Sequence, residues 1–67
     1  MEDAIFKEYE KFINADVVVR YHEGGEVKEL KGKLKFLNYN HLSCLVMTET
    51  EKIIVRNIST ITRKRNK

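Results

Sequence analysis

Residues 27–38 read VKELKGKLKFLN, a stretch in which apolar and charged residues alternate with a period of two. Such alternation predicts a β-strand with one face on the core and the other in water. The core face is expected to hold Leu30, Gly32, Leu34 and Phe36, and the wet face the lysines at 31, 33 and 35. Gly32 within this strand indicates a sharp bend or the close approach of another backbone. The lysine stripe is interpreted as the wet face of an edge strand, with nucleic-acid contact as the alternative.

Similar short alternating segments flank this stretch. They occupy residues 16–22, 42–48, 52–56 and 58–61, and turn-prone residues separate them. Residues 3–14 have apolar side chains at spacings of three and four, which predicts an amphipathic α-helix between Asp3 and Asn14. The sequence therefore predicts a mainly β protein: an N-terminal α-helix over 3–14, then five strands within 16–61 forming a strongly bent antiparallel sheet and a small open barrel.

Composition limits how so short a chain can be stabilised. Its 67 residues allow one domain with a marginal core. Cys44 is the only cysteine, so no internal disulfide is possible, and His22 and His41 lack the spacing of a zinc site. We expect no metal and no cofactor, and we expect self-association, with the fourth strand of one copy pairing with the fifth strand of the next.

Charge is distributed unevenly along the chain. Residues 1–16 hold five acids and two lysines, a net charge of −3, whereas residues 52–67 hold six cations and no acid. This asymmetry favours an anionic partner at one face. A basic tail over 63–67 would attract phosphate groups through Arg63, Lys64, Arg65 and Lys67. The alternative is a frayed tail that serves solubility.

Two motifs resemble those of the Sm-like (LSm/Hfq-like) family of RNA-binding proteins, and the chain is most similar in appearance to its bacterial Hfq or archaeal Sm-like members. Gly32-Lys33-Leu34-Lys35-Phe36-Leu37-Asn38 resembles the first Sm motif, and Asn57-Ile58-Ser59-Thr60-Ile61 resembles the end of the second. The resemblance covers residues 3–62, which gives an Sm-like domain over 1–62. It implies a non-catalytic homo-oligomeric ring of six or seven copies that binds single-stranded RNA around its pore, as an RNA chaperone or post-transcriptional regulator. The second motif departs from the family, because Val55-Arg56-Asn57 lacks a glycine.

Single-stranded RNA requires stacking surfaces, polar groups for base edges and cations for the backbone. The residues expected to supply them are Asn38, Tyr39, Asn40, His41, Arg56 and Asn57. Tyr39 and His41 are the stacking candidates, and Arg56 can stack on a base or pair with phosphate. For each of these the alternative is structural: turn chemistry for the asparagines, a ring that caps the barrel end, or exposed side chains.

No nucleophile stands beside a base in the sequence, and Gly24-Gly25 lacks the pattern of a phosphate-binding loop, so we expect no enzyme activity. No apolar run is long enough to cross a bilayer, and a lone thiol without an export signal is typical of a cytoplasmic protein. Two other functions remain open. One is a small SH3-like barrel that mediates protein–protein interaction, and the other is a basic protein that binds double-stranded DNA.

Overall fold

The computed structural model describes residues 6–64. It contains a 3-10 helix, η1 (Glu8–Phe12), followed by five strands: β1 (Asp16–Glu23), β2 (Glu26–Asn38), β3 (Ser43–Met47), β4 (Lys52–Val55) and β5 (Ile58–Arg63). The strands form one antiparallel sheet in the order β4-β3-β2-β1-β5. The mainly β class and the number of strands are therefore confirmed. The predicted third strand begins at Ser43 rather than Leu42, and the fifth runs two residues further than expected.

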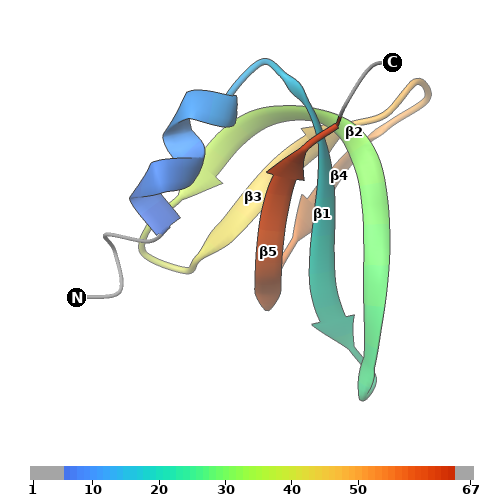
Figure 1. Cartoon of the computed structure of the whole chain (residues 1–67). Helices are drawn as coiled ribbons and strands as arrows, with labels where there is room; N and C mark the ends of the chain where they lie inside the picture. Colours follow the sequence, from blue (N-terminus) through green and yellow to red (C-terminus); the bar gives the residue numbers. More distant parts are fainter. Residues whose placement is uncertain (1–5, 65–67) are drawn as a thin grey trace.

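The long β2 strand is shared between two partners. Its first part, from Glu26 to Lys33, pairs with β1, and its last part, from Lys33 to Asn38, pairs with β3. Figure 1 shows β2 as a long curved strand, with the β1–β2 hairpin projecting beyond the rest of the sheet. The prediction of a strongly bent sheet forming a small open barrel is wrong, because the sheet is neither closed nor strongly curled. β4 and β5 lie at its two opposite edges.

The predicted N-terminal α-helix is also wrong, because the only helix among the elements of residues 6–64 is the short 3-10 helix η1. Ile13 and Ala15 donate backbone hydrogen bonds to the carbonyls of Glu10 and Phe12, which is the i+3 spacing of a 3-10 turn. Asn14 then takes a positive φ of 75°. The N–H of Asn14 donates to the Leu34 carbonyl at 2.6 Å, which joins this turn directly to β2. Residues 3–5 of the predicted helix lie outside the described residues.

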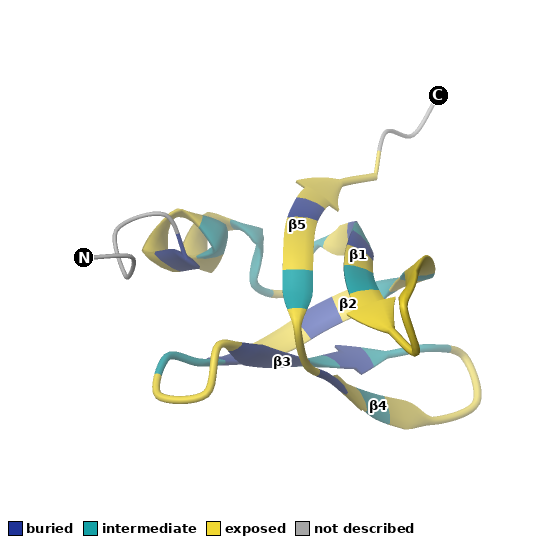
Figure 2. Ribbon diagram, turned by 90° about the horizontal axis from the view of Figure 1, so that it is seen from below, coloured by how far each residue is buried: buried dark blue, intermediate teal, exposed yellow. Residues whose placement is uncertain are grey.

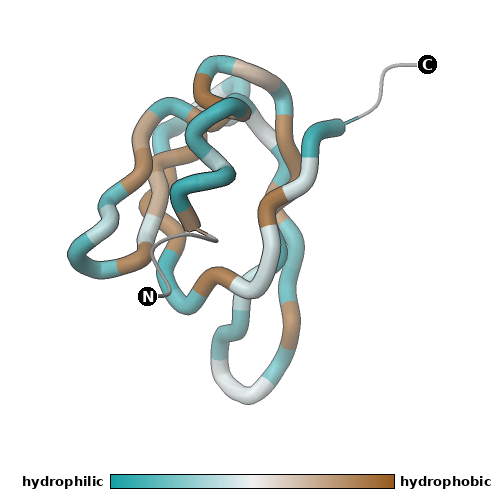
Figure 3. Tube along the Cα trace, turned by 60° about the vertical axis from the view of Figure 1, so that its left-hand side comes forward, coloured by the Kyte–Doolittle hydropathy of each residue, from teal (hydrophilic) through white to brown (hydrophobic). Residues whose placement is uncertain are grey.

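One face of the sheet carries the core. Four of its side chains have no exposed surface: Val17 and Val19 on β1, Leu34 on β2 and Val46 on β3. The rest of the core consists of Phe6, Leu37, Cys44, Val55 and Ile61. Figure 2 shows buried positions on all five strands and in the N-terminal helical segment, and Figure 3 shows hydrophobic and hydrophilic residues alternating along the trace. The alternation places polar side chains on the opposite face, which we call the outer face.

Gly32 lies where β3 leaves no room for a side chain on β2. A Cβ atom at this position would lie 2.6 Å from Cγ1 of Val46 and 2.7 Å from the carbonyl oxygen of Met47. Any side chain would therefore overlap with the neighbouring strand β3. The expectation that another backbone approaches at Gly32 is confirmed.

A β-bulge interrupts the alternation along β2. Leu34 is the register partner of Val46 and Phe36 that of Leu45, so Lys35 has no partner on β3. The extra residue exchanges the faces beyond it. Leu37 is 4% exposed and enters the core, whereas Phe36 is 58% exposed on the outer face. The prediction that Phe36 shares the core face with Leu34 is therefore wrong.

Candidate nucleic-acid interface

An apolar row crosses three strands on the outer face. Phe36 is the register partner of Leu45, and Leu45 is the partner of Ile54. Phe36 and Ile54 are among the most exposed large apolar side chains of the described residues, at 58% and 63%. An exposed aromatic ring beside two aliphatic side chains on a sheet is a flat surface on which a base can stack. We call these three residues the apolar row.

The loop after β2 brings polar groups next to the apolar row. The side-chain oxygen of Asn38 accepts hydrogen bonds from the backbone N–H of Asn40 at 3.0 Å and of His41 at 3.3 Å. This Asx turn fixes the path of the loop after the strand. It returns His41 to the end of the apolar row. The turn chemistry expected as the alternative role for the asparagines thus applies to Asn38.

Together these elements line a cavity of about 300 Å³. Its walls come from the end of β2, the following loop, β3 and the end of β4: Phe36, Asn38, His41, Ser43, Cys44, Leu45, Ile54 and Arg56. Three of the six predicted RNA-binding residues meet here, namely Asn38, His41 and Arg56. The cavity thus combines two aromatic rings, one guanidinium and one amide. We call it the aromatic cavity.

Arg56 follows β4 directly and is exposed. Besides the aromatic cavity it lines a neighbouring hollow of about 240 Å³, which also contains Asn57 and the end of β1. The ion pairs found within residues 6–64 join other cations to glutamates, so Arg56 has no carboxylate partner in the described part of the chain. A guanidinium so placed is available to stack on a base or to contact a phosphate.

Asn57 has a backbone role in the fold. Its φ of 56° lies in the left-handed region, which asparagine tolerates better than most residues. Its carbonyl oxygen accepts a hydrogen bond from the N–H of His22 at 3.1 Å. Asn57 therefore turns the chain from β4 to β5, which accounts for an asparagine at this position. It lies beside the aromatic cavity and not in its wall.

The remaining two loop residues lie outside the aromatic cavity. Tyr39 is half-buried, and its ring meets that of Phe6 edge to face, with centroids 5.7 Å apart. Desolvation raises the pKa of Tyr39, and the nearby Glu10 carboxylate raises this pKa further. The ring therefore packs against the N-terminal segment, as the structural alternative for Tyr39 predicts. Asn40 is exposed at the tip of the loop.

Two residues of the predicted basic tail lie at the end of β5. Arg63 is the last residue of β5 and pairs with Val17, and the N–H of Lys64 donates to the Asp16 carbonyl at 2.9 Å. These two cations lie at the end of β5 away from Arg56, which precedes its start. Arg65 and Lys67 lie outside the described residues. The structure thus places Arg63 and Lys64 in a different region from Arg56.

Cys44 is the one thiol at the aromatic cavity, and its side chain is 2% exposed. Burial raises the pKa of Cys44 to about 11. At neutral pH the sulfur is therefore a protonated thiol, a poor nucleophile that packs as an apolar group.

Residues 6–64 hold no group of three His, Cys, Asp or Glu side chains arranged for a metal ion. They also include no helix of the length and apolarity that a membrane span requires.

Sequence reasoning missed Phe36, Leu45 and Ile54. Phe36 and Leu37 are adjacent apolar residues, and such a pair in an alternating strand was the signal that one of them points away from the core.

Comparisons with known protein families, with curated proteins and with solved structures found no match to this chain.

Proposed function

We propose that this chain is a non-catalytic, Sm-like protein that binds single-stranded RNA and assembles into a homo-oligomeric ring of six or seven copies. The observation that carries the proposal is the aromatic cavity, in which the exposed ring of Phe36 lies with His41, Asn38 and Arg56. These groups are the ones that an unpaired nucleotide requires: a stacking surface, polar groups for base edges and a cation.

The shape of this surface favours a single strand over a duplex. The apolar row lies flat on the sheet, and a base can stack there only when its own face is uncovered. In a duplex the base faces are covered by their neighbours, and recognition then depends on groove edges and phosphates. Phe36 and Ile54 offer no hydrogen bond to a groove edge, so their exposure is explained better by a splayed base.

The sheet order supports the assembly. β4 and β5 are the two edges, and they belong to opposite ends of the sheet. An unpaired strand edge offers its backbone donors and acceptors to another chain. Pairing of β4 with β5 of the next copy is a head-to-tail contact, which closes into a ring when the rotation per copy allows it. Repetition of one aromatic cavity per copy then multiplies a modest affinity for one nucleotide.

Fluorescence anisotropy of labelled oligo(U) and oligo(A) tests the RNA-binding proposal, with Phe36→Ala as the critical variant. Stacking on an aromatic ring contributes about 1–3 kcal/mol per base, so the variant should bind roughly 5- to 150-fold more weakly. Val27→Ala is the matched control, because Val27 is also a 58% exposed apolar residue of β2 but lies far along the strand from the aromatic cavity. Equal affinity of Phe36→Ala and the parent would refute this site.

Light scattering tests the assembly independently. A ring should have six or seven times the 7.9 kDa mass of the chain. A monomer that still binds oligonucleotide would refute the ring and leave the site intact. A monomer that ignores RNA at low salt would refute both proposals and favour the protein–protein interaction module instead.

A further inference from the structure

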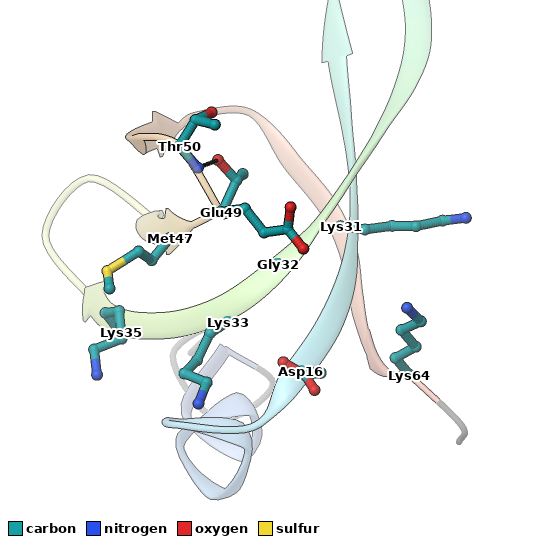
Figure 4. A pocket seen from close by; sticks show the side chains of 10 residues that line it. Asp16, Lys31, Gly32, Lys33, Lys35, Met47, Glu49, Thr50 and Lys64 are labelled. Atoms are coloured by element: carbon teal, nitrogen blue, oxygen red, sulfur yellow. Dashed lines mark hydrogen bonds between the residues drawn. The ribbon is translucent and has the colours of Figure 1, made fainter. Parts of the chain in front are cut away.

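The outer face carries a second region, built around Gly32 and distinct from the aromatic cavity. It is a broad hollow of about 800 Å³, lined by the lysines at 31, 33, 35 and 64, the carboxylates of Asp16 and Glu49, and the β3–β4 turn. Four lysines against two acids give it a net positive charge. In Figure 4, Lys33 and Lys35 extend on one side of Asp16, and Lys31 and Lys64 lie on the other.

The lysines come together because of the strand register. Asp16 is the partner of Lys33, Lys33 is the partner of Met47, and Met47 is the partner of Lys52. The backbone hydrogen bond from Lys64 to Asp16 adds the end of β5 to this row. A row of the outer face thus crosses the whole sheet, and Asp16 of β1 stands in it between Lys64 and Lys33 of β2. We call the hollow of about 800 Å³ described above, together with the residues that line it, the basic hollow.

These ammonium groups are not used by ion pairs within residues 6–64. The three ion pairs found there belong to Lys11, Arg20 and Lys28. Lys35 donates to the side-chain oxygen of Asn14 at 3.0 Å, a neutral partner that leaves its charge in place. The basic hollow therefore holds an excess of positive charge that nothing in the described part of the chain neutralises, which an anion can do.

The basic hollow and the aromatic cavity share the outer face. On β3, Leu45 of the apolar row and Met47 of the basic hollow are two residues apart, which is about 7 Å along a strand. Lys35 lines the hollow and the next residue, Phe36, lines the cavity. One extended chain can therefore lie across both regions without leaving the face.

We infer that the basic hollow binds the phosphate backbone of the same RNA strand whose base stacks in the aromatic cavity, an inference that rests on the proposed function. No aromatic side chain lines the hollow, and it is wide and polar. Flexible ammonium groups on an open surface contact phosphates without reading bases. The cavity then holds a base, and the hollow holds the strand that leads to it.

The salt dependence of oligonucleotide affinity tests this inference. The triple variant Lys31→Gln/Lys33→Gln/Lys64→Gln removes three charges from the hollow, and Lys7→Gln/Lys11→Gln/Lys28→Gln removes three charges elsewhere. Each phosphate contact on a single strand contributes about 0.7 to the slope of log affinity against log salt. The first triple should reduce this slope by about 2, and the second should leave it within about 0.5 of the parent.

Glu49→Gln gives a test of opposite sign, because Glu49 lines the hollow and Figure 4 shows its side chain extending from the β3–β4 turn toward Gly32. Removal of this negative charge should tighten binding, an effect that damage to the fold does not produce. Equal slope losses in both triples, or no loss in either, would overturn the inference. Phe36→Ala separates the two proposals, since it should weaken binding at every salt concentration and keep the slope. Absence of any binding by the parent would overturn both.

Discussion

Substitution of Gly32 by alanine should destabilise the fold, and the structure sets the size of the effect. The added Cβ would meet Cγ1 of Val46 at 2.6 Å and the Met47 carbonyl oxygen at 2.7 Å. Both contacts are about 1 Å shorter than the 3.5–4.0 Å optimum between non-bonded atoms. The Met47 carbonyl belongs to the backbone of β3, and Val46 has no exposed surface, so neither atom can withdraw without disturbing the sheet or the core.

Overpacking of this kind costs about 1–3 kcal/mol. Alanine also stabilises by restricting the unfolded chain, but only by about 0.4–1 kcal/mol, so the strain is expected to dominate. A chain of this length has a total stability of roughly 3–10 kcal/mol. Each kcal/mol lost should lower the melting temperature by about 4–8 °C. Gly32→Ala is therefore expected to lower the free energy of unfolding by a large fraction of its total.

Urea unfolding followed by circular dichroism measures the change in free energy. Gly24→Asn is the matched control, because Gly24 has a φ of +61°, which asparagine tolerates, and a Cβ there would meet nothing within 4 Å. The control should stay within about 0.5 kcal/mol of the parent. If Gly32→Ala were as stable as the control, the close packing of β2 on β3 described above would be wrong.

Two further predictions concern residues beside the proposed site. Tyr39→Phe should keep both RNA affinity and stability. Tyr39→Ala should lose the edge-to-face pair with Phe6, which lowers the free energy of unfolding in urea by about 0.5–1.5 kcal/mol in addition to the loss of buried area. A large loss of affinity in Tyr39→Phe would instead make its hydroxyl an RNA contact. The pKa of Cys44 is raised from 9.0 to about 11, so the unfolded state ionises first and stability should fall as the pH rises from about 9 to 11. Cys44→Ala should remove this part of the alkaline decline, and an unchanged pH profile would contradict the burial of the thiol.

The sequence predicts the strands well because their alternation is local. Five strands appear close to their expected bounds, and Gly32 is the point of close approach that its place in an apolar strand indicates. The predicted α-helix is wrong because apolar spacing alone does not decide between helix types. Here the hydrogen bond from Asn14 to Leu34 joins the chain to β2 soon after η1 ends.

The candidate site depends on information that local pattern does not contain. Asn38, His41 and Arg56 were predicted from residue chemistry and position in loops, and the aromatic cavity does unite them. Phe36 and Ile54 could be found only from the register across three strands, and the assignment of Phe36 also required the bulge. Tyr39 shows the converse, because an aromatic residue in a loop has the same sequence signature whether it packs or stacks.

The bulge at Lys35 determines how this surface responds to a change in the length of the chain. Removal of that one residue would leave Leu34 and Phe36 adjacent in a regular ladder, so that Phe36 stayed on the outer face and Leu37 stayed in the core. An in-frame loss of the Lys35 codon would thus remove the bulge and one cation of the basic hollow, while the exposed aromatic ring stayed in place. The same deletion within a regular part of the strand would exchange the two faces beyond it.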